Sequence, residues 1–207
     1  MNTSKILNLV LAIAVLTLVI ELAFAQGNKN QTSKSNSPLE NIYSRASIRS
    51  YQNKAVEEEK VEQLLKAAMS APTAANKQPW AFIVIDDKDV LKKLADNLPH
   101  AKMTAEAPLA IAVCGDLSKA LDGDAADYWV QDASAASENL LLAAHALGLG
   151  AVWTGVYPIK DRVAAVSKIL NLPENIIPLN VIPIGYPEGN TKPKDKWNQS
   201  NIHKNKW

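Results

Sequence analysis

The sequence predicts an α/β sandwich, in which a sheet of about four strands has helices on both faces. Three observations support this fold class. Segments with the period of an amphipathic helix alternate along the chain with short apolar segments of strand length. Hydrophobic residues make up 47% of the chain and charged residues 21%, a balance that permits a sizeable core and argues against wholesale disorder. The second half of the longest predicted helix is apolar on every side, so other elements must cover it all round.

The predicted elements follow one another in regular order. Periodicity and composition predict helices over 39–45 (a short turn), 57–70, 88–97, 125–147 and 160–170. Continuous apolar segments predict strands over 80–86, 108–115, 150–156 and 179–185. In the helix over 57–70, Val61, Leu64 and Ala68 have the i, i+3, i+7 spacing of a buried face. Residues 186–207 are polar and rich in lysine, and they are predicted to form a tail.

The first 38 residues are predicted to lie outside the folded domain, which covers 39–207. Lys5 precedes an apolar segment that ends in Ala23-Phe24-Ala25, a small–x–small sequence typical of a signal peptidase site. Residues 1–25 are therefore predicted to be a signal peptide. An uncleaved anchor is the alternative, because the segment reaches the ~20 residues that span a bilayer. Residues 26–38 are predicted to be a flexible linker. The domain is expected to be exported, periplasmic or secreted, or anchored to the membrane by its N-terminal segment.

Composition excludes several kinds of site. The 22 basic and 21 acidic residues leave a net charge of +1, which provides no strong field for nucleic acid. The single cysteine, Cys114, excludes an intrachain disulfide and a multi-cysteine metal site, and three scattered histidines argue against a histidine-based one. No glycine-rich dinucleotide motif or P-loop is present. If the chain is an enzyme, its chemistry is expected to come from a bound organic cofactor, with no catalytic side chain and no metal.

The first candidate binding segment contains Arg45, Ser47 and Arg49. Two guanidinium groups four residues apart, with a hydroxyl between them, can converge on one anion. Arginine makes bidentate, charge-assisted hydrogen bonds to phosphate, and serine adds a neutral donor. The segment therefore predicts an anion site, with an ordinary basic surface turn as the alternative.

Two further segments have the chemistry expected around a planar ring. Residues 70–80 contain Asn-x-Gln-Pro-Trp ahead of a strand, and the amides of Asn76 and Gln78 each offer a donor and an acceptor to a heteroaromatic edge. At the end of another strand, Gly155 permits close approach to the backbone and Trp153 offers a flat apolar face. The alternatives are a plain polar loop and a core tryptophan.

A fourth segment begins with Gly-Tyr-Pro over 185–187 and continues into the lysine-rich tail. Lys194 and Lys196 alternate along the chain, so an extended tail would place both ammonium groups on one side. There they could supplement Arg45 and Arg49 around a phosphate dianion. A merely solvated tail is the alternative.

In this order and at these distances, the four segments resemble the FMN-dependent nitroreductase family, over about residues 39–203. The family pattern has Arg-Arg-Ser-x-Arg near the start, Pro-Ser-x-x-Asn-x-Gln-Pro-Trp before a strand, Gly-x-Gly-x-x-Trp-x-Gly, then Gly-Tyr-Pro and a basic tail. This chain departs from it at Ala46, where the family often has arginine or histidine, at Thr73 for serine and at Lys196 for arginine. A backbone contact by Ala46 would survive the first change.

The resemblance implies an α+β, nitroreductase-like fold. Its central, mostly antiparallel sheet of four to five strands is flanked by helices, and its C-terminal tail extends onto the partner subunit. It further implies an obligate homodimer with FMN at the subunit interface and NADH or NADPH as electron donor. The apolar helical segment over 139–147 independently favours dimerisation.

The resemblance also implies three groups of cofactor-binding residues. The group that holds the FMN phosphate and ribityl chain is Arg45, Ala46, Ser47, Arg49, Lys194 and Lys196. The group that lines the pocket, from the same or the other subunit and with the asparagine near ring N5, is Pro72, Thr73, Asn76 and Gln78. The group that lies against the ring near N5 and O4 is Trp153, Thr154 and Gly155.

The implied activity is transfer of hydride or electrons from NAD(P)H or another donor, through FMN, to a small nitroaromatic or quinone-like acceptor. Two alternatives remain open. A different flavin enzyme of the same fold, such as a reductive dehalogenase, would be favoured by a large lid, but the connections over 99–108 and 118–124 are short. A non-catalytic flavin-binding or scavenging module is favoured by export, because pyridine nucleotides are scarce outside the cytosol.

Overall fold

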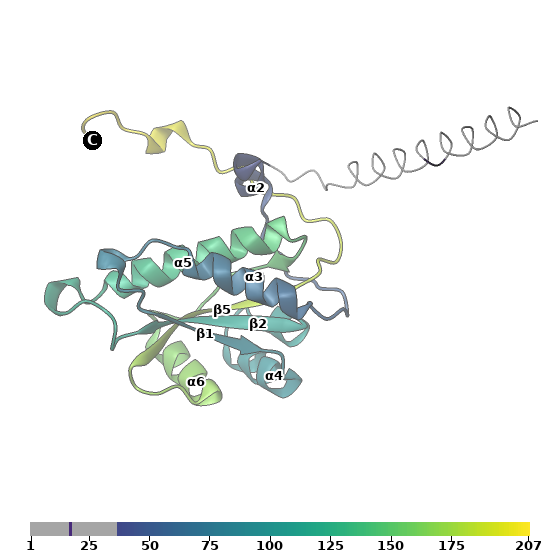
Figure 1. The fold of residues 1–207 in the computed structure, drawn as a ribbon, viewed down its shortest axis with the longest axis horizontal. Helices are drawn as coiled ribbons and strands as arrows, with labels where there is room; N and C mark the ends of the chain where they lie inside the picture. The colour runs from purple at the N-terminus through teal and green to yellow at the C-terminus, as the bar shows by residue number, and fades with distance from the viewer. Residues whose placement is uncertain (1–16, 18–36) are drawn as a thin grey trace, which may run out of the picture. The chain divides into compact units, whose positions relative to one another are not determined.

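In the part of the chain that the structure describes, five α-helices surround a five-stranded, mostly antiparallel sheet (Figure 1). The structure is a computed structural model, and it describes residue 17 and residues 37–207. Apart from residue 17, the predicted signal peptide or anchor over 1–25 lies outside the described residues, as does the predicted linker over 26–38 except for its last two residues. Among the described residues, no helix is both long enough and apolar enough to cross a bilayer.

The sheet has the strand order β1–β2–β5–β3, and β4 also pairs with β5. All of these strand pairs are antiparallel, and a single parallel bridge joins Ser47 to Ala151. The α+β fold with a mostly antiparallel sheet is therefore confirmed. The strands are β1 (Trp80–Ile85), β2 (Leu109–Asp116), β3 (Gly150–Ala151), β4 (Thr154–Gly155) and β5 (Ile176–Gly185).

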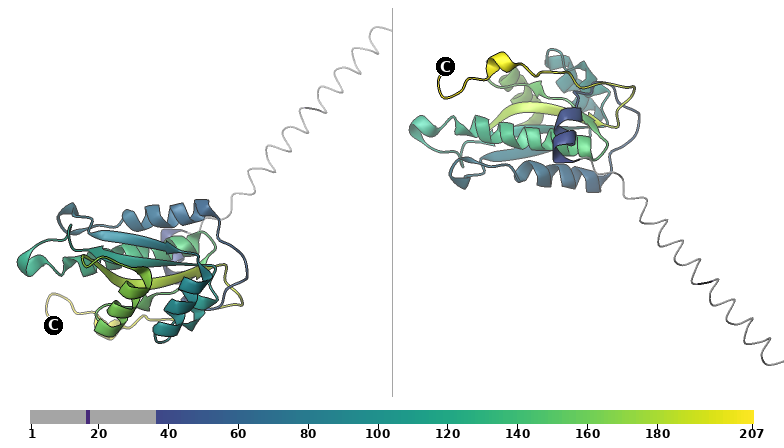
Figure 2. Two further views of the ribbon diagram at one scale, coloured as in Figure 1. Left: turned by 90° about the horizontal axis from the view of Figure 1, so that it is seen from below. Right: turned by 90° about the horizontal axis from the view of Figure 1, so that it is seen from above.

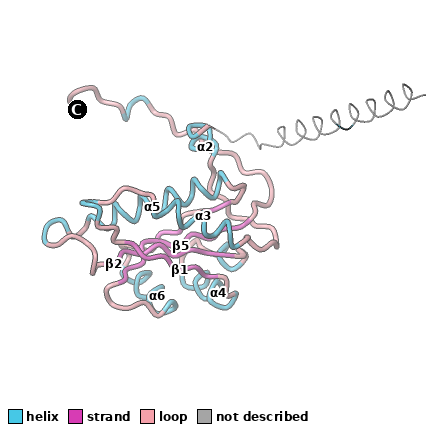
Figure 3. Tube along the Cα trace, viewed as in Figure 1, coloured by secondary structure: helices cyan, strands magenta, loops and turns pink. Residues whose placement is uncertain are grey.

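Helices cover both faces of the sheet, as the sequence predicts. The helices are α2 (Pro38–Ser44), α3 (Glu58–Met69), α4 (Lys88–Asn97), α5 (Tyr128–Ala146) and α6 (Lys160–Leu170). Figures 1 and 2 show α3 and α5 on one face and α4 and α6 on the other, and Figure 3 shows the strands as the layer between them. The short helix α2 packs against α5.

Strand β2 shows how period-2 alternation builds two cores. Leu109, Ile111 and Val113 belong to the core under α3 and α5. Ala110 and Ala112 point the other way, into the core under α4 and α6. Every residue of β2 is buried, which explains why this segment is apolar without alternation in the sequence.

Polar residues define the ends of two helices. The carboxylate of Asp87 accepts hydrogen bonds from the backbone N–H groups of Asp89 and Val90, so it caps the start of α4. Helix α6 ends at Asn171, which adopts a left-handed conformation with φ of 50°. Asparagine tolerates this conformation better than most residues, so the predicted end of the helix is confirmed.

Two strands differ from their predicted extents by more than one residue at an end or by an interruption. The strand predicted over 150–156 is divided into β3 and β4, which pair with β5 in one continuous register. In that register, the break between β3 and β4 lies opposite Pro183, which has no backbone N–H to donate to a neighbouring strand. Strand β5 begins at Ile176, three residues before its predicted start at Leu179, and it includes Pro178. The sheet accommodates this proline beside a register shift in the pairing with β2, next to Val113.

Candidate functional site

A cavity of about 830 Å³ lies between two segments far apart in the sequence. One wall comes from the end of α2 and the extended residues that follow it. The other wall comes from the C-terminal tail. The lining residues include all six that the family resemblance assigns to a phosphate group: Arg45, Ala46, Ser47, Arg49, Lys194 and Lys196. The structure therefore brings the first and the fourth sequence segments together.

The first wall is held against the sheet by backbone pairing. Ile48 donates its N–H to the carbonyl oxygen of Ala151 at 3.1 Å, and Ser47 forms the parallel bridge to the same residue. Ile48 packs directly on Gly150, where an added Cβ would lie 2.6 Å from the Ile48 Cβ. The absence of a side chain at Gly150 is thus what lets this wall approach β3, while Ser47 and Arg49 line the cavity.

Tyr51 anchors the far end of the same segment. Its side chain is buried, and its hydroxyl donates hydrogen bonds to the carbonyl oxygens of Ile48 at 2.8 Å and Pro183 at 3.1 Å. Burial raises the pKa of the Tyr51 hydroxyl far above its usual value, more strongly than the nearby Arg49 lowers it. The hydroxyl therefore stays protonated and serves as a donor to backbone.

Helix α5 supports the first wall from the side. Glu138 lies 3.4 Å from Nε of Arg45 and forms an ion pair with it. About two helical turns further on, Nε2 of His145 lies 2.8 Å from the hydroxyl of Ser44, and that hydroxyl itself donates to the carbonyl of Glu40. Burial, and secondarily the charge of Arg45, lowers the pKa of His145. A neutral His145 with its proton on Nε2 fits these contacts.

The electrostatics of the cavity favour an anion. Its lining includes five cationic side chains and the single carboxylate of Asp195, and Ser47 adds a hydroxyl. The side chain of Arg45 is only 19% exposed, so a bond that it makes to an anion is partly shielded from solvent. The arrangement can hold a phosphate dianion through charge-assisted hydrogen bonds.

The second sequence segment forms a turn that does not line this cavity. Gln78 donates from its N–H to the Thr73 hydroxyl at 3.1 Å and from its side chain to the Asn76 side-chain oxygen, also at 3.1 Å. Ala75, Asn76 and Gln78 all have positive φ, which is uncommon for residues other than glycine. Pro72, Asn76 and Gln78 are exposed, and Gln78 lines a separate cavity of about 510 Å³.

Asp132 holds this strained turn, although no motif in the sequence marks it. The carboxylate of Asp132 is buried within α5 and accepts a hydrogen bond from the N–H of Ala74 at 2.9 Å. The sequence does contain an indication of this role, because Asp132 lies between Trp129 and Ala136 on the stripe of α5 that faces the core. A charged residue at such a position needs a specific partner.

The third sequence segment lies next to the first wall. Strand β4 follows β3 after two residues, and the hydroxyl of Thr154 donates to the carbonyl of Val181 inside the sheet. The Thr154 hydroxyl proton is therefore used within the sheet. Gly155 leaves open space, since the nearest atom to an added Cβ is Nε1 of Trp153 at 3.8 Å. The Gly155 carbonyl accepts from Arg162 at 3.2 Å, which fixes the backbone at this point.

The reactive groups outside these segments do not suggest a second chemistry. Cys114 is buried in β2, and burial raises the pKa of its thiol to about 12, so it stays protonated and unreactive. Within residue 17 and residues 37–207, no cluster of histidine, cysteine, aspartate and glutamate could hold a metal ion.

Comparisons with known proteins agree with this geometry. Residues 42–99 and 96–186 match the Nitroreductase family. A protein of Methanothermobacter thermautotrophicus, which has the inferred name NADH dehydrogenase/NAD(P)H nitroreductase, is 47% identical over 170 residues, covering 82% of this chain and 87% of that protein. A crystal structure from Parabacteroides distasonis with the same inferred name is 48% identical, with a TM-score of 0.78 and coverage of 82% of this chain and 98% of that one.

A third similar protein has a cofactor in its name. The structure of an FMN-dependent nitroreductase from Clostridium difficile is 32% identical to this chain, with a TM-score of 0.72, and the match covers 79% of this chain and 96% of that one. The family match, the identities and the structural similarity all extend over most of the described domain. The chain therefore belongs to the nitroreductase family of oxidoreductases.

Proposed function

We propose that this protein is an FMN-dependent oxidoreductase. It takes reducing equivalents from NADH or NADPH and passes them to a small nitroaromatic or quinone-like acceptor. The observation that supports this most directly is the cationic cavity between Arg45, Arg49 and the tail lysines, next to the strands that end at Gly155.

The donor set fits the phosphate end of FMN. A phosphate monoester is mostly a dianion at pH 7, and burying part of that charge requires cations and hydrogen-bond donors. Arg45 and Arg49 supply planar donors from one wall, and Lys194 and Lys196 supply ammonium groups from the other. Ser47 adds a neutral donor between the two arginines.

The ring end of the site is proposed to lie along β4. Bound FMN supplies the hydride chemistry, and the protein positions it and excludes water. Gly155 gives the ring access to the backbone, and the bond from Arg162 to the Gly155 carbonyl keeps that backbone from shifting. The turn that contains Asn76 and Gln78 is proposed to complete the pocket, and in a dimer it would do so from the partner subunit.

Alanine at Gly155 tests the position of the ring. Because the nearest atom to the new Cβ lies 3.8 Å away, Gly155→Ala should fold as well as the unmodified protein. The Cβ would nevertheless occupy space that we assign to the ring, so FMN binding should weaken by roughly 10-fold, in line with an overpacking cost of about 1–3 kcal/mol. Fluorescence titration of FMN measures this effect. Unchanged FMN affinity would place the ring elsewhere.

The proposal includes a homodimer, in which a partner subunit covers apolar side chains and receives the tail. Leu39 and Ile42 on α2 are exposed, as are Trp197 and Ile202 on the tail. Figure 1 shows this tail running beside α2, away from the sheet. Ile42 and Trp197 line the same cavity, and large apolar groups exposed together commonly mark an interface. Light scattering of the FMN-loaded protein should give the mass of a dimer, and a stable loaded monomer would contradict the proposal.

Reduction of bound flavin tests the function itself. The purified protein should be yellow, and addition of NADH or NADPH without oxygen should bleach its visible absorbance. Nitroaromatic and quinone acceptors should then restore the colour, and a halogenated phenol in the same series tests the dehalogenase alternative. A protein that binds FMN but is bleached by neither nucleotide would be a flavin-binding module, and the oxidoreductase proposal would fail.

Export of the domain is also part of the proposal, and it rests on the N-terminal sequence alone. Residues 1–25 have the charged, apolar and small–x–small parts of a signal peptide. Intact mass measurement of the protein from its native cell should show Gln26 as the first residue. A full-length mass in the membrane fraction would support the anchor, and a full-length mass in the cytosol would contradict export.

A further inference from the structure

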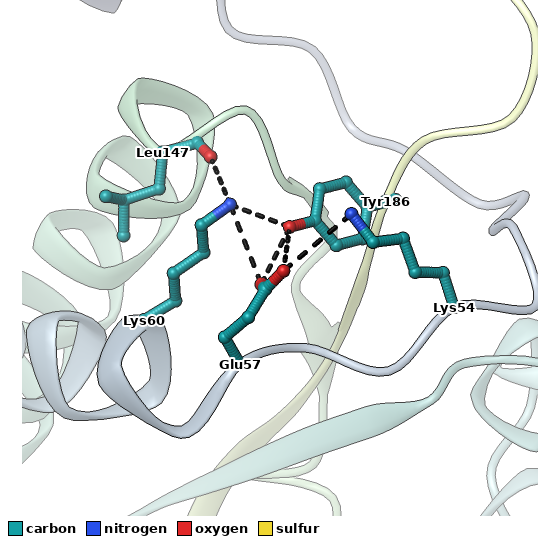
Figure 4. Close-up of polar contacts among 5 residues, drawn as sticks. All are labelled: Lys54, Glu57, Lys60, Leu147 and Tyr186. Carbon is teal, nitrogen blue, oxygen red and sulfur yellow. Dashed lines mark hydrogen bonds and ion pairs between the residues drawn. The ribbon is translucent and has the colours of Figure 1, made fainter.

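A chain of polar contacts joins the start of the C-terminal tail to helix α3, and Figure 4 shows it in close-up. Tyr186 follows β5 directly, and its hydroxyl lies 2.8 and 2.7 Å from the two carboxylate oxygens of Glu57. Nζ of Lys60 donates to the same hydroxyl at 2.8 Å and to the Leu147 carbonyl, just past α5, at 3.3 Å. The ammonium of Lys54 lies 3.5 Å from the centre of the Tyr186 ring. We call Lys54, Glu57, Lys60 and Tyr186 the tyrosine anchor.

The hydrogen bonds of the tyrosine anchor have one consistent direction. Lys60 can only donate and an ionised Glu57 can only accept, so the Tyr186 hydroxyl accepts from the first and donates to the second. This hydroxyl is the main cause that lowers the pKa of Glu57 and raises the pKa of Lys60. Both groups are therefore charged near neutral pH, and phenylalanine at position 186 could replace neither contact.

The backbone beside the anchor forms a short antiparallel ladder. Gln52 donates its N–H to the Tyr186 carbonyl at 2.9 Å, and Glu188 donates to the Ser50 carbonyl at 3.0 Å. Tyr51 and Pro187 form the bridge between these two bonds. Since residue 50 faces residue 188, both walls of the cavity extend from the same end of this ladder, one before residue 50 and the other after residue 188.

We propose that Tyr186 is a positioning residue for the cofactor phosphate. By fixing the ladder, it sets the direction in which the tail leaves, and so brings Lys194 and Lys196 to the cavity opposite the two arginines. Tyr186 itself makes no contact with the cofactor. The proposal rests on the proposed function, because it takes the FMN phosphate as the ligand of the cavity.

The test replaces Tyr186 by phenylalanine in the full chain and measures FMN affinity by fluorescence titration. Loss of the hydroxyl should weaken FMN binding about 3- to 10-fold, the range expected for one hydrogen bond. Amide hydrogen exchange at Gln52 and Glu188 in the FMN-free protein should become faster. Tyr128→Phe, the same chemical change at an exposed tyrosine at the start of α5, is the matched control and should change neither quantity.

A double-mutant cycle separates positioning from general destabilisation. In a Lys194→Ala/Lys196→Ala background, Tyr186→Phe should weaken FMN binding less than 2-fold further, because the groups that it positions are gone. A full additional loss in that background would overturn the positioning role, as would unchanged affinity in Tyr186→Phe alone. If the lysine variant by itself binds FMN normally, the failure lies instead in the proposed phosphate site.

Discussion

Alanine at both Arg45 and Arg49 should release the flavin from the purified protein and leave the fold intact. Both guanidinium groups line the cationic cavity, and a hydrogen bond to a charged group contributes about 1.5–3 kcal/mol. Loss of two such groups should therefore weaken FMN binding by roughly 100-fold to 10,000-fold. The absorbance spectrum after desalting and the dissociation constant from fluorescence titration measure this change.

The control for this variant removes two cations elsewhere. Lys66 on α3 and Lys93 on α4 are exposed and lie outside the cavity, so Lys66→Ala/Lys93→Ala has the same change in net charge. It should keep its yellow colour, which would show that position and not total charge matters. If the double arginine variant stays fully yellow, the anion held by this cavity is not the cofactor phosphate.

Alanine at Gly150 should be among the most destabilising single substitutions in the domain. The new Cβ would lie 2.6 Å from Cβ and Cγ2 of Ile48 and 2.7 Å from Cγ1, and no flexible chain end lies there that could move aside. Overpacking of this kind lowers the free energy of unfolding by about 2–3 kcal/mol, which corresponds to a fall in Tm of roughly 5–10 °C for a domain of this size. Thermal unfolding followed by circular dichroism measures it.

The same variant should also bind FMN poorly, because relief of the clash must push Ile48 and its neighbours Ser47 and Arg49 away from β3. The FMN-free Gly155→Ala protein is the stability control, since its Cβ meets nothing closer than 3.8 Å. Equal melting temperatures for the two glycine variants would show that Ile48 can move away from β3 without loss of stability, which would contradict tight packing of Ile48 on Gly150.

Local sequence predicts most of the fold, and β2 and α4 show why. All eight residues of β2 are buried, so the apolar character of residues 109–114 follows from burial on both faces. Asp87 caps α4 by accepting hydrogen bonds from residues two and three positions further on, so the cap is encoded in the local sequence. The division between β3 and β4 could not be predicted in this way, because it depends on Pro183 in a strand later in the chain.

The candidate site was predictable only in pieces. The spacing of Arg45 and Arg49 indicated an anion site, and the alternation of Lys194 and Lys196 placed two ammonium groups on one side of an extended tail. No local pattern could show that the tail returns to the two arginines, and that approach was implied by the family resemblance. Asp132 and Tyr186 were missed as supporting residues for a common reason. Their partners, Ala74 for the first and Glu57 for the second, are set by how α5 and the tail pack in three dimensions.

The walls of the cavity come from the first and the last segments of the described domain. A ligand held between them therefore acts as a non-covalent crosslink between the two ends of the chain, with α3 to β5 enclosed in the closed loop. During synthesis this crosslink cannot form until residues 194–196 have left the ribosome, so cofactor loading must follow synthesis of the tail. Removal of the tail should abolish that closure while the sheet and its helices remain.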